Sequence, residues 1–138
     1  MGNKSQNFEY IGKLHPAIAE RWNLQEHANK PIVVYSNVKQ HVITKHLKDF
    51  GSIEQIEYIW SKLSKVIKKP DEVFYNKTTK GLEYYKKIGD MIVVAVRINF
   101  GSTLKIKSFY PANSNKINNR RAKEEQLLLD GEIDDIFI

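Results

Sequence analysis

Apolar residues between positions 52 and 69 recur every three or four positions. This spacing is typical of one face of an α-helix, and it joins Ile53, Ile56, Trp60, Leu63 and Ile67. Ser52, with Gln55 three residues later, forms a capping box. One helix is therefore predicted from Ser52 to Lys69, where Pro70 ends it.

The rest of the first half contains two more helical segments and one strand. Residues 38–50 lie between Asn37, a suitable helix cap, and Gly51, a typical helix stop, so they predict a second helix. A shorter helix is predicted over residues 16–24. The β-branched run at residues 31–35 predicts a short buried strand.

After Pro70 the pattern changes from helical to extended. Four β-rich runs follow, at residues 72–75, 82–87, 91–100 and 103–110. Their connections are short, so neighbouring strands are expected to be antiparallel. A loop after Pro111 and a short helix from Arg120 to Leu129 complete the layout. The order predicts an α+β fold, with N-terminal helices packed on one face of a four- to five-stranded antiparallel sheet.

Length and composition fit a single domain over residues 1–138. Its core is expected over about residues 10–112, followed by a loop, a short helix and an acidic tail over 113–138. The chain has no cysteine, which excludes disulfides, thiolate metal sites and cysteine nucleophiles. No apolar run approaches the roughly 20 residues of a membrane-spanning helix, and the N-terminus lacks a signal-peptide core. A cytoplasmic location without membrane association is therefore expected.

Charge is segregated along the chain. Residues 1–61 hold seven basic and six acidic side chains, residues 62–123 hold fifteen and four, and residues 124–138 hold none and six. The middle segment thus carries a charge of +11 and the last one −6. Such a basic segment favours an anionic partner such as nucleic acid.

The helix over residues 38–50 carries three side chains that could do chemistry. At about 100° per residue, His46 lies on the same side as the apolar positions, whereas His41 and Lys45 lie on the flank. His46 is therefore expected to point towards the sheet. The alternative is a core histidine that is hydrogen-bonded to the backbone.

The last strand offers a hydroxyl and a phenol. Strict alternation places Ser108 and Tyr110 on the same face as Leu104 and Ile106, which should face the helices. An inward-pointing His46 would then meet Ser108 and Tyr110 near the end of the strand. The alternative is an ordinary polar pair at a strand end.

Basic side chains surround this region in sequence. They are Lys86, Lys87, Arg97, Lys105, Lys107, Arg120 and Arg121. Each alone could be a solvated surface charge, but together, with Tyr75, Tyr84, Tyr85 and Tyr110 interleaved, they suit phosphate binding and base stacking. Phosphate-binding glycine loops, dinucleotide fingerprints and zinc or calcium motifs are missing from the sequence. Neither a metal nor another cofactor is expected.

Three stretches resemble the phage-associated Barnase–EndoU–colicin–RelE-like (BECR) nuclease domains. They are His41–His46, Lys69–Val73 and Leu104–Tyr110, and the resemblance spans about residues 38–112. It implies helices followed by a four-stranded antiparallel sheet, and metal-independent cleavage of RNA, often by toxins. By this resemblance, His46 matches the family's helix histidine, and Ser108 and Tyr110 match the hydroxyl and aromatic positions of its last strand. Arg97 and Lys107 are looser matches to family positions.

The function expected from the sequence is that of a toxin-like endoribonuclease. His46 would act as base or acid, Lys45, Arg97 or Lys107 would bind phosphate, and Ser108 and Tyr110 would position or donate to it. His41, Lys86, Lys87, Lys105, Lys107, Arg120 and Arg121 would bind the nucleic acid. The substrate would be RNA, with tRNA among the candidates.

A toxin would also need an acidic immunity protein or antitoxin, and would act in the cytoplasm of its own cell or of a target cell. Two other functions are open: a non-catalytic RNA- or DNA-binding module, and a phage structural or interaction protein on the same fold. The acidic tail from Glu124 to Ile138 could cover the basic surface in place of RNA or dock a partner; the alternative is a solvated terminus.

Overall fold

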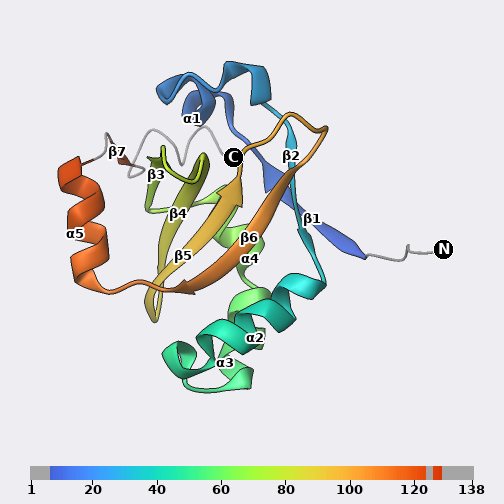
Figure 1. The fold of residues 1–138 in the computed structure, drawn as a ribbon, viewed down its shortest axis with the longest axis vertical. Coiled ribbons are helices and arrows are strands. Elements are labelled where there is room, and N and C mark those ends of the chain that lie inside the picture. The colour runs from blue at the N-terminus through green and yellow to red at the C-terminus, as the bar shows by residue number, and fades with distance from the viewer. Residues whose placement is uncertain (1–6, 124–125, 129–138) are drawn as a thin grey trace.

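The computed structural model describes residues 7–123 and 126–128, and one mixed sheet forms its centre (Figure 1). Six strands have five residues or more: β1 (Phe8–Lys13), β2 (Pro31–Tyr35), β3 (Glu72–Asn76), β4 (Gly81–Ile88), β5 (Asp90–Arg97) and β6 (Leu104–Pro111). The three-residue β7 (Gln126–Leu128) adds a seventh at one edge. The strand order is β1-β2-β6-β5-β4-β3-β7, and all neighbours are antiparallel except β2 and β6.

The α+β class and the antiparallel run from β3 to β6 match the sequence prediction, but the sheet is wider than predicted and partly parallel. β1 was not predicted, because its first three residues are exposed and only Ile11 and Gly12 are buried. So short a buried segment shows neither helical nor strand periodicity. β1 pairs with β2, and β2 joins the sheet by running parallel to β6.

Six helical segments surround the sheet among the described residues: α1 (Pro16–Arg21), the 3-10 helix η1 (Gln25–His27), α2 (Asn37–Phe50), α3 (Ile53–Trp60), α4 (Leu63–Lys68) and α5 (Ser114–Lys123). Gly51 ends α2 with a φ of +90°, and Ser52 caps α3 by accepting a hydrogen bond from the Gln55 backbone N–H at 3.1 Å. None of these helices is long and apolar enough to cross a bilayer.

Two helix predictions need correction. The single helix predicted over residues 52–69 is interrupted at Ser61 and Lys62, so α3 and α4 are separate helices, although both bury their apolar residues in the core. α5 runs from Ser114 to Lys123, six positions earlier than predicted at both ends, and residues 126–128, predicted to be helical, form the strand β7. Its Ile117 packs against Phe74 and Tyr85, so a tertiary contact outweighs the weak helix propensity of this Asn-rich segment.

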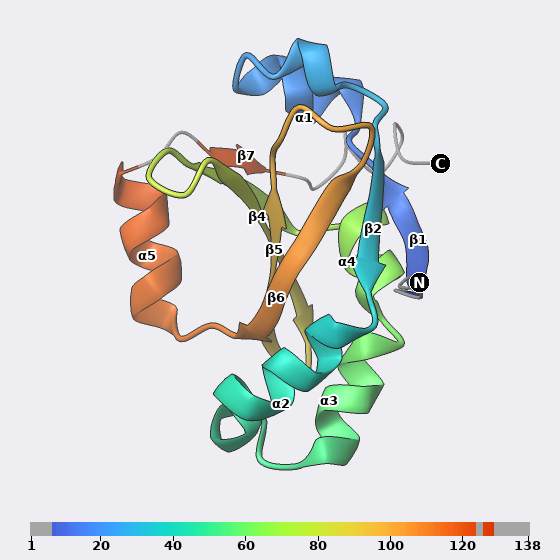
Figure 2. The same ribbon diagram turned by 45° about the vertical axis from the view of Figure 1, so that its right-hand side comes forward.

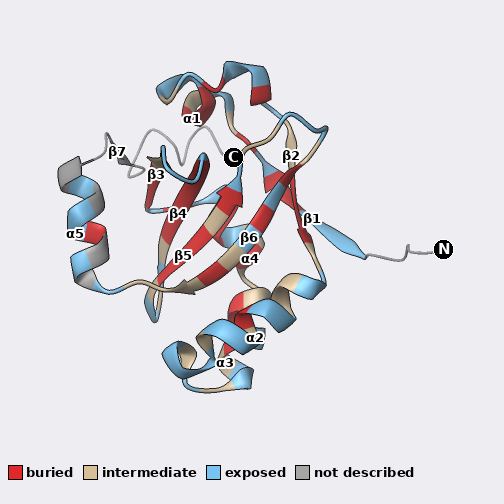
Figure 3. Cartoon of the chain, viewed as in Figure 1, coloured by how far each residue is buried: buried red, intermediate tan, exposed pale blue. Residues whose placement is uncertain are grey.

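Buried residues are concentrated in the strands of the sheet (Figure 3), and its two faces are covered by different helices. The main core lies on one face, where residues of α2, α3 and α4 pack against strand residues such as Val94, Ile106 and Phe109. The opposite face holds a small cluster of Phe74, Tyr85 and Val93 beneath Ile117 of α5. We call this second side the α5 face; beyond α5 it carries the pocket described next.

Candidate active site

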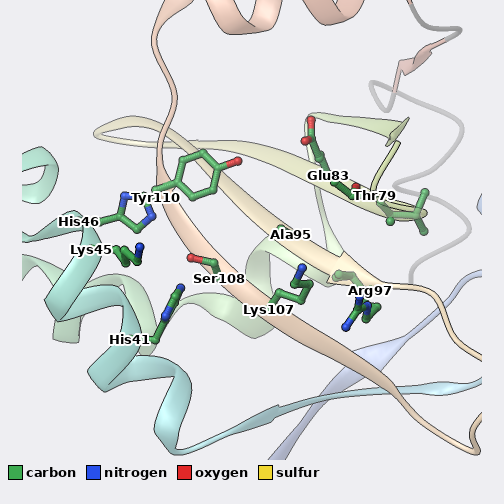
Figure 4. Close-up of a pocket in the computed structure, with 13 residues that line it drawn as sticks. His41, Lys45, His46, Thr79, Glu83, Ala95, Arg97, Lys107, Ser108 and Tyr110 are labelled. Atoms are coloured by element: carbon green, nitrogen blue, oxygen red, sulfur yellow. The ribbon is translucent and has the colours of Figure 1, made fainter. Parts of the chain in front are cut away.

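A pocket of about 380 Å³ lies on the α5 face, between α2 and the strands β4, β5 and β6 (Figure 4). Its lining residues come from α2, from the β3–β4 turn and from these three strands: His41, Lys45, His46, Thr79, Gly81, Leu82, Glu83, Ala95, Val96, Arg97, Lys107, Ser108 and Tyr110. The pocket therefore brings together all five predicted catalytic residues and two of the predicted nucleic-acid-binding residues, His41 and Lys107.

A β-bulge in β6 orients the residues of the last strand. Ala95 of β5 pairs with Ser108, but the next residue, Val96, pairs with Ile106, so Lys107 is the extra residue. The bulge restarts the side-chain alternation, which lets both Ile106 and Phe109 reach the core. The prediction that Ser108 and Tyr110 share the face of Leu104 and Ile106 is therefore wrong: both residues lie on the α5 face.

The bulge is explained by the aromatic residues of the core. Phe109 is fully buried, and its ring lies 5.9 Å from that of Phe50 and 6.1 Å from that of Trp60. Strict alternation would have moved Phe109 out of the main core and placed Ser108 there instead, at a clear cost in hydrophobic free energy.

His46 contacts both a carboxylate and an aromatic ring. Its Nδ1 lies 2.9 Å from Oδ2 of Asp49, one turn further along α2, and its ring stacks on that of Tyr110 with centroids 4.9 Å apart. Its side chain is 24% exposed, so the ring is held in place but reaches the pocket. A carboxylate at Nδ1 favours the tautomer with the proton on Nδ1 and leaves Nε2 able to exchange a proton with a ligand. The hydrogen-bond partner of His46 is therefore a side chain, whereas the core-histidine alternative predicted a backbone partner.

Ser108 has a buried hydroxyl at the pocket. Its Oγ makes no hydrogen bond within the described part of the chain. An unsatisfied buried hydroxyl costs about 1–3 kcal/mol, so such a group invites a functional explanation. Figure 4 shows Ser108 between the residues of α2 and Arg97, within the lining of the pocket.

Three cationic side chains line the pocket. Lys45, Arg97 and Lys107 are all exposed, and none forms an ion pair with a described carboxylate. Exposed cations that converge on a pocket favour an anionic ligand, and a phosphodiester fits this description.

Sequence reasoning gave no site role to Glu83 or Thr79. Glu83 is 6% exposed, and its carboxylate accepts a hydrogen bond from the Tyr85 hydroxyl at 2.9 Å. In the sheet, Glu83 pairs with Ala95, which pairs in turn with Ser108, so the three share one face. Only the strand register reveals this neighbourhood, because Glu83 and Ser108 lie 25 positions apart.

Several predicted nucleic-acid-binding residues lie outside the pocket. Lys86 Nζ donates a hydrogen bond to the Lys69 carbonyl at 2.6 Å, and Arg121 pairs with the buried Glu72, its Nε lying 3.0 Å from Oε2. The hydrogen bond to Glu72 also raises the pKa of Arg121. Lys86 and Arg121 therefore have structural partners.

Among the described residues, the remaining predicted basic residues and tyrosines do not line the pocket. Lys87 and Lys105 are exposed outside the pocket. The Arg120 side chain lies outside the described residues, as does the acidic tail from Glu124 to Ile138 except for residues 126–128, which form β7. Tyr84 and Tyr85 are fully buried, so they cannot stack on bases as predicted; burial also raises the pKa of the Tyr84 phenol. Among the described residues, no three His, Asp or Glu side chains are grouped as metal ligands would be.

Fold and pocket together define a small α+β domain whose pocket is lined by a histidine, a serine hydroxyl and three cations that form no ion pair within the described part of the chain. A comparison with protein families agrees with this class. The chain belongs to the family described as phage-Barnase-EndoU-ColicinE5/D-RelE like nuclease3, whose model matches residues 9–119. The resemblance seen over residues 38–112 is thereby confirmed and extended in both directions. No curated protein and no solved structure gives a significant match.

Proposed function

We propose that this nuclease-family domain is an endoribonuclease of toxin type that cleaves RNA by attack of the 2′-hydroxyl on the neighbouring phosphate. The observation that carries the proposal is His46, held by Asp49 and Tyr110 and placed in a pocket with unpaired cations. A histidine oriented by a carboxylate is the usual arrangement for general acid–base catalysis.

The reaction requires two proton transfers. One group removes the proton of the 2′-hydroxyl as its oxygen bonds to phosphorus, and another protonates the 5′-oxygen as the P–O5′ bond breaks. The products are a 2′,3′-cyclic phosphate and a 5′-hydroxyl. His46 Nε2 would perform one of these transfers, since an imidazole nitrogen can accept and donate a proton. Asp49 would act as a positioning residue through Nδ1.

Negative charge grows on the phosphate oxygens as the 2′-oxygen attacks. Lys45, Arg97 and Lys107 would offset this charge, and Ser108 Oγ would donate a hydrogen bond to one of the oxygens. The stacking contact with Tyr110 would keep the imidazole of His46 beside them. DNA would be a poor substrate, because it has no 2′-hydroxyl. An acidic inhibitor protein would complement this basic pocket by charge.

His46→Ala tests the proposal directly. Purified protein and variant are incubated with RNA in EDTA, and the 3′ ends of the fragments are identified. We expect wild type to give cyclic-phosphate ends and His46→Ala to be slower by about a hundredfold or more, with an unchanged melting temperature. His27→Gln, at a buried histidine outside the pocket, is the matched control and should cleave like wild type.

Two results would contradict the assignment. Equal cleavage by His46→Ala would remove His46 from the chemistry. Salt-sensitive RNA binding without any product from wild type would instead support the non-catalytic binding module.

A further inference from the structure

Three aromatic side chains form a strip at the β1 edge of the sheet. Phe8 and Tyr10 of β1 are 56% and 61% exposed, and Tyr35 of β2 is half-buried beside them. Phe8 pairs with Tyr35 across the two strands, with ring centroids 5.4 Å apart, and Tyr10 follows Phe8 by two residues on the same face. We call Phe8, Tyr10 and Tyr35 the aromatic strip.

The aromatic strip lies on the same face as the pocket. Arg97, which lines the pocket, pairs with Lys105 of β6, and Lys105 pairs with Val33 of β2. Val33 pairs in turn with Tyr10. Lys105 Nζ also lies 5.2 Å from the ring centroid of Tyr35, which places the cation and the aromatic ring on one surface. β6, β2 and β1 run side by side in Figure 2.

This arrangement suits an unpaired nucleic-acid strand. Proteins bind such strands with cations along the backbone and with exposed rings on which successive bases stack. β6 and β1 are two strand spacings apart, about 10 Å, which is a few steps of a stacked strand at roughly 3.4 Å each. Bases in a duplex are paired and face inward, so they are not available to these rings.

We propose that the aromatic strip, with Lys105, binds unpaired nucleotides that flank the cleaved phosphate, which makes single-stranded RNA the substrate. The proposal rests on the proposed function for the location of the cleaved phosphate. It assigns substrate selection to β1 and β2 and leaves the chemistry to the pocket. The strip would contribute affinity only for substrates that extend beyond a dinucleotide bound in the pocket.

The test compares binding and cleavage in separate assays. Binding uses a single-stranded octanucleotide with 2′-O-methyl groups, which lacks the nucleophile and cannot be cut by the proposed route. Cleavage uses a dinucleotide, too short to reach the strip. The variant is Phe8→Leu with Tyr10→Leu, which keeps apolar side chains on β1 but removes the rings. Tyr58→Leu on α3 is the matched control, because Tyr58 is 49% exposed with Lys62 Nζ 5.4 Å from its ring centroid.

We expect the double variant to bind the octanucleotide at least about tenfold more weakly and to cleave the dinucleotide like wild type. Tyr58→Leu should bind the octanucleotide like wild type. A second variant, Tyr35→Leu, should also weaken octanucleotide binding. Unchanged affinity in folded Phe8→Leu/Tyr10→Leu and Tyr35→Leu would overturn the inference, even if wild type cleaves the dinucleotide. Weakened binding with no cleavage by wild type would support the strip and refute the ribonuclease.

Discussion

Two buried hydroxyl groups, those of Ser108 and Tyr84, make no hydrogen bond within the described residues. Ser108 lines the pocket, whereas Tyr84 lies in the main core under the helices. A substrate phosphate would satisfy Ser108 Oγ under the proposed function. Nothing in the described structure gives the Tyr84 hydroxyl a comparable partner, so its burial costs free energy that no hydrogen bond offsets.

The two hydroxyls should therefore respond in opposite ways. Ser108→Ala should lower the rate of RNA cleavage by roughly tenfold or more and leave the free energy of unfolding unchanged or higher. Tyr84→Phe should raise the free energy of unfolding by about 1 kcal/mol and leave cleavage unchanged. Urea denaturation and initial rates measure both effects. A large loss of stability in Ser108→Ala would show that its hydroxyl has a structural partner.

At the scale of elements, α5 is attached to β3 by an ion pair. Glu72 of β3 is 5% exposed, and Arg121 on the last turn of α5 donates two hydrogen bonds to its carboxylate. Ile117 of the same helix packs against Phe74. The pair gives Arg121 a structural role, so we expect it to contribute little to RNA binding.

Arg121→Ala should affect stability and not RNA binding. It leaves the Glu72 carboxylate buried without its cation; because the Arg121 side chain is 44% exposed, the expected loss is about 1–2 kcal/mol, below that for a fully buried pair. RNA affinity should change little. Lys107→Ala is the matched comparison and should weaken RNA binding without loss of stability. The opposite pattern would restore Arg121 as an RNA ligand.

The segment from α1 to η1 carries a histidine that resists protonation. His27 is 4% exposed, its ring lies 5.6 Å from that of Phe100, and its Nδ1 lies 2.8 Å from Lys30 Nζ. Burial, and then the charge of Lys30, lower the pKa of His27 below its ordinary value of 6.5. The folded protein therefore binds this proton less readily than the unfolded chain.

Stability should consequently fall as the pH drops. Below about pH 6.5 the unfolded chain takes up a proton that folded His27 does not, so the free energy of unfolding decreases until the pH reaches the lowered pKa. His27→Gln should reduce the difference in unfolding free energy between pH 7 and pH 5, measured by urea denaturation. An identical pH dependence in both proteins would exclude His27 as a source.

At the scale of the whole molecule, charge is distributed unevenly. Residues 62–123 carry +11 within a net charge of +6, and Arg97, Lys105 and Lys107 of this segment lie on the α5 face together with Lys45 of α2. These four cations extend from the pocket to the aromatic strip. Counterion release from RNA should therefore contribute strongly to affinity.

RNA affinity should fall steeply with salt. About four phosphate contacts predict a slope near −3 when the logarithm of the binding constant is plotted against the logarithm of salt concentration for a single strand. Lys107→Ala and Lys105→Ala should each reduce the slope by about 0.7. Fluorescence titrations with the 2′-O-methyl octanucleotide provide the measurement. A slope near zero would contradict an electrostatic contact at this face.

Sequence patterns predicted the strands from β3 to β6 and helix α2 to within one residue, except that β5 ends three residues before its predicted end, because these elements carry strong local signals. They did not predict β1, the break between α3 and α4, or the position of α5. Each of these depends on contacts between distant segments, such as β1 with β2 and Ile117 with Phe74.

The sequence by itself determined the presence of His46, Ser108, Tyr110 and the basic residues, and helical periodicity predicted that His46 lies on the side of α2 that faces the sheet. Only the tertiary structure decided which face Ser108 and Tyr110 occupy, because the bulge at Lys107 depends on burying Phe109. The tertiary structure likewise decided that Glu83 and the aromatic strip lie on the α5 face, because strand pairing places them there. Register is a property of two strands at once, so one strand's pattern cannot specify it.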